Sequence, residues 1–100
     1  MMAVLTTKQR QYLRGLAHPL SPIVRIGKAG VTDNVVAETR KSLDSHELIK
    51  VRIEVDEGTQ RRDIATRLAE ATDAQVAGTI GKVAILYRER EEDPEIKLPA

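Results

Sequence analysis

Two spacings of hydrophobic residues along the chain predict a mixture of strands and helices. The clearest strand signal spans 48–55, where apolar residues alternate with Lys50, Arg52 and Glu54. This period of two is typical of a strand with one solvated face. Further strand signals lie at 23–26, 75–79 and 83–88.

Apolar residues at helical spacing predict a first helix over about 7–17. Thr6, followed three residues later by Gln9, fits a capping box at its start. The inward face of this helix is expected to carry Leu13, Leu16 and Ala17. The helix should end before the two prolines within 18–22, because each proline pushes the residue before it out of the helical region.

Two more helices are predicted downstream. One follows an N-cap at Thr32 and reaches about His46, and the other runs from a Thr59 cap to about Thr72. The resulting order, α-β-α-β-α-β-β, makes βαβ crossovers and then closes with an antiparallel hairpin. We therefore expect a two-layer α/β domain with a four-stranded mixed sheet over 1–88, and a charged C-terminal tail over 89–100.

Composition excludes several classes of protein. A chain of 100 residues holds one domain, and without cysteine it forms no disulfide and no thiolate metal site. Its longest apolar runs have five residues, too short for a membrane span or a secretory signal, so we expect a cytoplasmic protein. The only aromatic residues are Tyr12 and Tyr87, which disfavours a sheet that reads RNA bases by stacking.

The net charge of +1 hides a strong asymmetry along the chain. Residues 1–52 carry nine basic and four acidic side chains, a net charge of +5, whereas 53–100 carry a net charge of −4. The first 32 residues hold five basic side chains and no acidic one. This segregation favours a basic surface that binds a polyanion.

The loop formed by Gly27, Lys28, Ala29 and Gly30 is the main candidate for function. It is a KH-like GxxG loop, similar to the one with which KH domains clamp a nucleic-acid backbone, and it lies between a predicted strand and the helix that Thr32 caps. Two glycines let backbone N–H groups approach a phosphate, the helix N-terminus adds its dipole, and Lys28 adds a full charge. The alternative is simple turn chemistry. A second GxxG at 78–81 has no helix after it, and we interpret it as hairpin geometry.

Basic side chains surround this loop in the predicted fold. Each one alone is most simply a solvated surface charge, but together they favour a polyanion site. The residues concerned are Arg25 on the strand before the loop, Lys50 and Arg52 on the solvated face of the next strand, and Lys8, Arg10 and Arg14 on the first helix.

No enzymatic motif is present. His18 is expected in a structural capping role at the end of the first helix, before a proline. His46 is expected at the end of the second helix, where an imidazole suits the negative end of the helix dipole. The acidic cluster of Glu89, Glu91, Glu92 and Asp93 lacks the spacing of a calcium loop, so we interpret it as a solvated tail. We expect no catalytic residue, no metal and no cofactor.

Five ordered segments resemble the YhbY/CRM family of RNA-binding proteins. They are LTTKQR at 5–10, LRGLAHPLSP at 13–22, IGKAGVT at 26–32, HELIKV at 46–51 and GKVAILYR at 81–88. The resemblance implies a fold similar to the C-terminal domain of translation initiation factor three. It maps the GxxG loop of the family onto 27–30 and places Lys82 and Arg88 in its last block. With these two residues and Thr32 beside the loop, the set of candidate RNA-binding residues is complete. The resemblance carries over no catalytic residue.

The resemblance also implies a role. Single-domain bacterial members of the family associate with precursors of the large ribosomal subunit, so the expected partners are ribosomal RNA and, beside it, ribosomal proteins. We expect a monomer that does not bind membranes. Three alternatives remain open: a protein-interaction module that uses the sheet face or the acidic tail, a binder of a small phosphate ligand, and a purely structural role.

Overall fold

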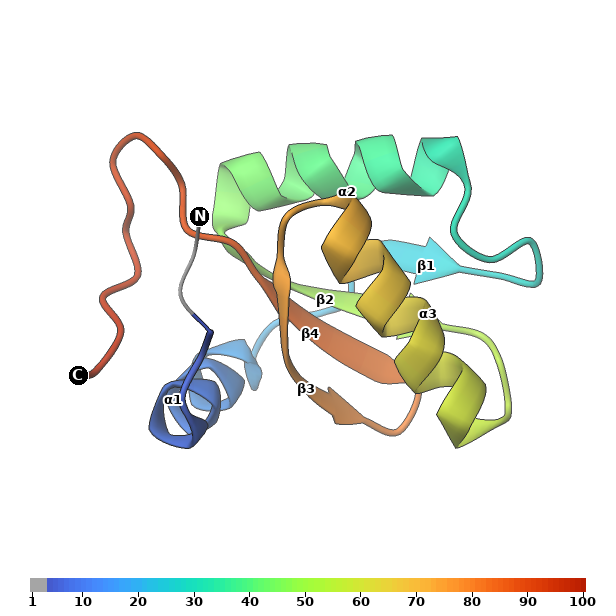
Figure 1. The fold of residues 1–100 in the computed structure, drawn as a ribbon, viewed down its shortest axis with the longest axis horizontal. Helices are drawn as coiled ribbons and strands as arrows, with labels where there is room; N and C mark the ends of the chain where they lie inside the picture. The colour runs from blue at the N-terminus through green and yellow to red at the C-terminus, as the bar shows by residue number, and fades with distance from the viewer. Residues whose placement is uncertain (1–3) are drawn as a thin grey trace.

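A four-stranded mixed sheet, in the order β1-β2-β4-β3, forms the centre of the computed structural model, which describes residues 4–100 (Figure 1). β1 runs parallel to β2, and β4 pairs antiparallel with both β2 and β3. The strands are β1 (Val24–Ile26), β2 (Leu48–Ile53), β3 (Gln75–Ile80) and β4 (Val83–Tyr87). This arrangement confirms the predicted element order and the mixed sheet.

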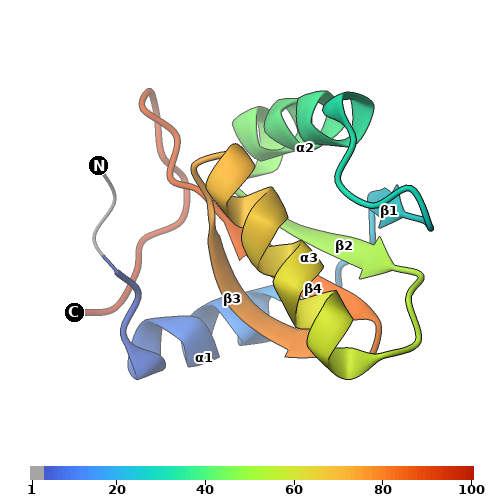
Figure 2. The same ribbon diagram turned by 45° about the vertical axis from the view of Figure 1, so that its right-hand side comes forward.

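Two helices, α2 (Asp33–His46) and α3 (Gly58–Ala71), cover one face of the sheet (Figures 1 and 2). The main hydrophobic core lies between them and the strands. Alternate strand residues such as Ile49, Val51 and Leu86 point into it, and each is no more than 1% exposed. From the helices, Leu43 and Leu68 fill the space above the sheet, as the spacing of apolar residues predicts.

The remaining helix, α1 (Thr7–Ala17), packs against the opposite face near one end of the sheet (Figure 2). Leu13 and Ala17 are fully buried there, in a second core with Ile85 and Tyr87 of β4. The two-layer expectation therefore describes the sheet with α2 and α3, and α1 adds a partial third layer. Strand 48–53 is consequently covered on both faces at its start.

Several element boundaries differ from the predicted ones. β2 ends at Ile53 rather than at residue 55, although the Glu54 N–H still donates to the carbonyl oxygen of Ile26 at 2.8 Å. α3 begins at Gly58 after an N-cap at Glu57, so Thr59 lies inside its first turn and does not cap it. Leu16 was expected on the inward face of α1 but is 39% exposed.

The second GxxG segment is also organised differently from the prediction. Gly78 lies within β3, paired with Ile85, and Gly81 alone of the two glycines adopts a positive φ in the β3–β4 turn. The interpretation as hairpin geometry is therefore correct for Gly81 and wrong for Gly78.

The C-terminal segment packs back onto the domain. Ile96 and Leu98 contact the core beneath α1, and the Gln9 side-chain amide donates to the carbonyl oxygen of Pro99 at 3.0 Å. The capping box that Gln9 forms with Thr6 is present as predicted. One end of α1 is thus held by the last residues of the chain.

Candidate nucleic-acid interface

The GxxG loop forms a tight turn between β1 and α2. The Gly30 N–H donates to the carbonyl oxygen of Gly27 at 3.1 Å, and Gly30 adopts a φ of +74°, a conformation that favours glycine. Lys28 and Ala29 are exposed at the tip. A β-carbon at Gly27 would meet no atom within 4 Å, so the backbone there is open to a ligand.

The N-terminus of α2 follows the loop directly. The Thr32 hydroxyl accepts a hydrogen bond from the Val35 N–H at 3.2 Å, which confirms the predicted N-cap. The amides of Asp33 and Asn34 belong to the first turn, where an α-helix leaves N–H groups without intrahelical partners. These donors lie beside the loop, while the exposed Asp33 carboxylate opposes an anion.

Arg25 and Arg52 lie side by side on neighbouring parallel strands. Both guanidinium groups face one carboxylate, Glu54, with a distance of 3.8 Å from Arg25 Nη1 to Glu54 Oε1. The Arg25 side chain is 73% exposed. Two cations that share one carboxylate leave an excess positive charge, and exposed ion pairs of this kind are weak enough for a phosphate to compete.

The part of the sheet beside α1 that carries Arg25, Arg52, Lys50 and Val83 is here called the open face. Register puts these side chains on the α1 side, because Lys50 pairs with the buried Ile85 and Arg52 with Val83. Lys50 has a structural role as well. Its Nζ donates to two carbonyl oxygens after α1, those of His18 at 3.2 Å and Leu20 at 2.9 Å.

The three basic residues predicted on α1 are present on its surface, and Lys8 and Arg14 are exposed while Arg10 is half-buried. Among residues 4–100, no hydrogen bond or ion pair engages their side-chain nitrogens. The Arg14 stem lies against Gly78 of β3. Arg14 is therefore on the same side of the sheet as Arg25 and Arg52.

The structure separates the remaining two predicted residues, Lys82 and Arg88. One end of the sheet holds the carboxyl ends of β1 and β2 together with the β3–β4 turn. Lys82 therefore lies at the same end of the sheet as the GxxG loop. Its Nζ pairs with Asp56 at 3.0 Å. Arg88 lies at the opposite end of the sheet, where β4 finishes.

Arg88 is built into the fold. It is 18% exposed, pairs with Asp44 of α2, and donates to the carbonyl oxygen of Thr72 at the end of α3 at 3.0 Å. These contacts join the C-terminal ends of two helices. The geometry does not bring Arg88 to the candidate interface.

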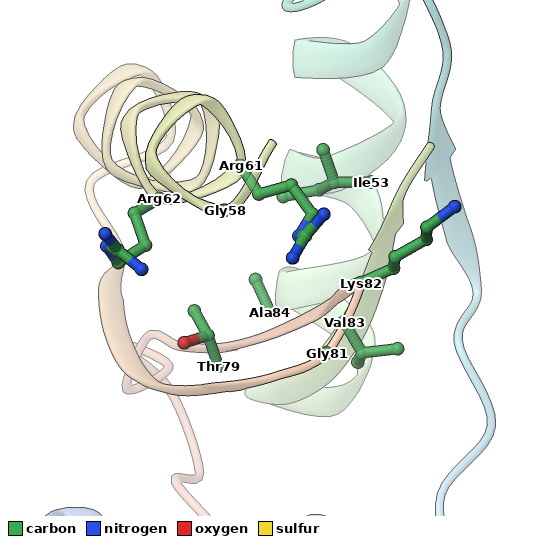
Figure 3. Close-up of a pocket in the computed structure, with 9 residues that line it drawn as sticks. All are labelled: Ile53, Gly58, Arg61, Arg62, Thr79, Gly81, Lys82, Val83 and Ala84. Atoms are coloured by element: carbon green, nitrogen blue, oxygen red, sulfur yellow. The ribbon is translucent and has the colours of Figure 1, made fainter. Parts of the chain in front are cut away.

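A pocket of about 40 Å³ lies where α3 begins, between Gly58 and the β3–β4 turn (Figure 3). Arg61 and Arg62 extend from α3 beside it, and Lys82 points away from Arg62. Pockets for small molecules usually measure about 300–1,000 Å³, so this one is too small for a nucleotide.

A larger hollow lies between the C-terminal ends of α2 and α3 and residues 89–93. Its lining includes three arginines but seven carboxylates, an arrangement that repels a phosphate ligand. No group of three or more His, Asp or Glu side chains in the described chain is arranged to hold a metal ion. None of the helices within residues 4–100 is long and apolar enough to cross a membrane.

Sequence reasoning missed Glu47, which is 1% exposed at the junction of α2 and β2. Its carboxylate accepts the backbone N–H groups of Arg90, Glu95 and Ile96 at 2.8–3.0 Å. Burial by itself raises the pKa of Glu47, but these N–H groups and the Arg90 charge outweigh it and hold the pKa below its ordinary value. No local sequence pattern marks Glu47, because its unusual feature, a φ of +60° directly after a helix, is visible only in the structure.

Comparison with known proteins identifies the family of the chain. The model of the CRS1/YhbY (CRM) domain matches residues 5–88. The chain belongs to this family. The match includes the GxxG loop, α1 and the open face, and it ends where β4 has just been completed.

Relatives of known name match nearly the whole chain. A protein of Haemophilus influenzae named RNA-binding protein is 42% identical over 98 residues, which is 98% of each chain. YqeI of Bacillus subtilis, named a probable RNA-binding protein, is 38% identical over 96% of this chain and all of its own. The solution structure of SAV1595 from Staphylococcus aureus, a candidate RNA-binding protein, has a TM-score of 0.86 and 40% identity, and covers 96% of this chain and 100% of that one.

Proposed function

We propose that the protein binds structured RNA through the sugar-phosphate backbone, and that it acts in the assembly of the large ribosomal subunit. The observation that carries the proposal is the GxxG loop, whose open backbone lies beside the N-terminus of α2 and the exposed Lys28. RNA-binding relatives of nearly full length support the choice of ligand. The expected setting is the cytoplasm, with the protein as a monomer on precursor particles.

In this proposal the loop binds one phosphate and the open face binds others. Backbone N–H groups at 28–30 and in the first turn of α2 donate to phosphate oxygens, while Lys28 supplies a mobile charge. Arg25 and Arg52 exchange their shared Glu54 for phosphates of the neighbouring strand of RNA. Thr32 retains its capping role and fixes the direction of the helix.

Recognition by this surface depends on RNA shape more than on base identity. Of the two tyrosines, Tyr87 is fully buried and Tyr12 is 42% exposed on α1, so no aromatic residue lies on the open face. Without stacking platforms, a protein distinguishes structured RNA mainly by the placement of its phosphates and 2′-hydroxyls. Ribosomal RNA, with its dense helices and junctions, offers such a surface, and ribosomal proteins are further partners.

The test is binding to a structured fragment of large-subunit ribosomal RNA, measured by fluorescence anisotropy at several salt concentrations. Contact with about four phosphates predicts a slope of log K against log salt of about −3 to −4. Gly27→Ala should keep its stability, because its β-carbon meets nothing, and should lose about 3- to 10-fold in affinity because the methyl group obstructs a phosphate.

A charge-reversed loop, Lys28→Asp with Ala29→Asp, should lose more affinity than Gly27→Ala and have a shallower salt slope. Lys97→Asp, an exposed reversal near the C-terminus, is the matched control. A salt slope near zero would contradict the electrostatic mechanism. Equal binding by the wild type and both loop variants would exclude the GxxG loop, and absence of RNA binding would favour the protein-interaction alternative.

A further inference from the structure

Gly78 is a glycine in the middle of β3, an edge strand of the sheet. Glycine weakens a strand interior, so its presence usually marks a bulge or the close approach of another group. The register does shift between Val76 and Gly78. Gly78 is not among the glycines with positive φ, however, so the backbone conformation accepts any residue and does not explain the glycine.

The close approach comes from Arg14 of α1. A β-carbon at Gly78 would lie 2.7 Å from Cδ and 3.2 Å from Cγ of Arg14, well inside van der Waals contact. The aliphatic stem of Arg14 therefore occupies the place where a side chain of β3 would otherwise stand. Its Nε is 3.6 Å from the same point, so the guanidinium begins close to the surface of β3.

This contact lies on the side of the sheet that carries the open face. Gly78 pairs with Ile85, Ile85 pairs with Lys50, and the next row along the strands contains Ile80, Val83 and Arg52. Arg14 thus brings a third guanidinium to the face that already has those of Arg25 and Arg52. In the described part of the chain, no carboxylate or hydrogen-bond acceptor engages Arg14.

We propose that Gly78 is a positioning residue for RNA binding. By lacking a side chain, it allows the Arg14 stem to lie on β3 and holds the guanidinium over the open face, where it binds an RNA phosphate. The inference rests on the proposed function and extends its footprint from the GxxG loop across β1 and β2 to β3. An alanine at position 78 would displace Arg14 without removing any charge.

The experiment is a double-mutant cycle on the same RNA fragment, with Gly78→Ala, Arg14→Ala and the double variant. Gly78→Ala should remain folded, because the obstructing atoms belong to a flexible side chain that can swing away. Circular dichroism and urea unfolding verify this. Each single variant should lose about 3- to 10-fold in affinity and reduce the magnitude of the salt slope by about 1 or less.

The double variant separates positioning from a general structural effect. If Gly78 acts through Arg14, adding Gly78→Ala to Arg14→Ala should cost nothing further. Gly15→Ala is the matched control, because its β-carbon meets no atom within 4 Å and it neighbours Arg14 in α1. It should bind RNA as the wild type does. The double variant also lacks the steric clash, so its binding can be measured even if Gly78→Ala unfolds.

Each outcome bears on one proposal. Additive losses in the double variant, or a normal affinity for Gly78→Ala beside a weakened Arg14→Ala, would overturn the positioning role. Normal affinity of Arg14→Ala would remove Arg14 from the interface and overturn the inference, while loss on reversal of Lys28 would still support the proposed function. If the wild type binds no RNA, the proposed function itself fails.

Discussion

Replacing Glu47 by glutamine tests how the C-terminal segment is held. In the structure, Glu47 Oε1 accepts the N–H groups of Glu95 and Ile96, and Oε2 accepts that of Arg90. Glutamine has the same shape but offers one acceptor oxygen and one NH₂ group. If its oxygen keeps Glu95 and Ile96, its NH₂ group then faces the N–H of Arg90, so two donors oppose each other.

The expected loss of stability follows from these contacts. A hydrogen bond to a charged group contributes about 1.5–3 kcal/mol, and a buried donor left without a partner costs about 1–3 kcal/mol. One bond is lost and two others are weakened when the charge is removed, so Glu47→Gln should lower the free energy of unfolding by about 2–4 kcal/mol. Urea unfolding measures this change, and Glu91→Gln, an exposed carboxylate in the same segment, is the control.

Acidity should reveal the same interaction. Because the folded state holds the pKa of Glu47 below its ordinary value of 4.5, its contribution is complete above that pH. It is lost as the pH falls through the folded-state value. The stability difference between wild type and Glu47→Gln should therefore shrink on acidification below 4.5. Equal stability of the two proteins at neutral pH, with unchanged hydrogen exchange at Arg90 and Ile96, would refute the reasoning.

Three further predictions concern single side chains. Burial, with the charges of Glu89 and Glu47, raises the pKa of Tyr87 to about 12. The free energy of unfolding should therefore fall as pH rises from 10 through 12, and Tyr87→Phe should remove the high-pH step of the tyrosine absorbance titration. Gly30→Ala should cost about 1 kcal/mol in urea unfolding, because φ is +74° there, and an unchanged midpoint would contradict this. Arg88→Met should lower stability by about 1–3 kcal/mol and leave RNA affinity unchanged, whereas weaker binding with normal stability would restore it to the interface.

The elements of the fold were predictable because each carries a local signal. The alternation in β2 and the capping box of α1 both depend on residues close together in sequence, and both are present in the structure. The placement of α1 on the second face was not predictable in the same way. Leu48 follows the alternation of β2 on the opposite side from Ile49, but only the fold reveals that it joins Leu13 of α1 in the second core.

The candidate site was predictable where the basic residues lie on elements that follow one another along the chain and pack side by side. Arg25, Lys28 and Arg52 lie near each other because the parallel strands β1 and β2 have their carboxyl ends at the same end of the sheet. Lys82 and Arg88 are six residues apart in sequence and belong to one sequence segment, yet they flank β4, which carries them to opposite ends of the sheet. The role proposed for Gly78 depends on a contact with α1, more than sixty residues earlier, and no local pattern encodes this contact.

Because the C-terminal tail is anchored, the charge asymmetry along the sequence becomes a separation of acidic and basic side chains in space. Glu47 lies just before β2, whereas the GxxG loop follows β1. Because these two strands are parallel, the two sites are at opposite ends of the sheet. Glu47 accepts hydrogen bonds from the backbone N–H groups of Arg90 and Glu95, and so keeps the acidic stretch 89–95 at the end of the sheet away from Lys28. A free acidic segment could approach the basic loop and compete with phosphates for it. A carboxylate buried at the base of the tail would therefore serve the proposed RNA interface without touching it, by separating the two signs of charge and preserving the positive potential that attracts a polyanion.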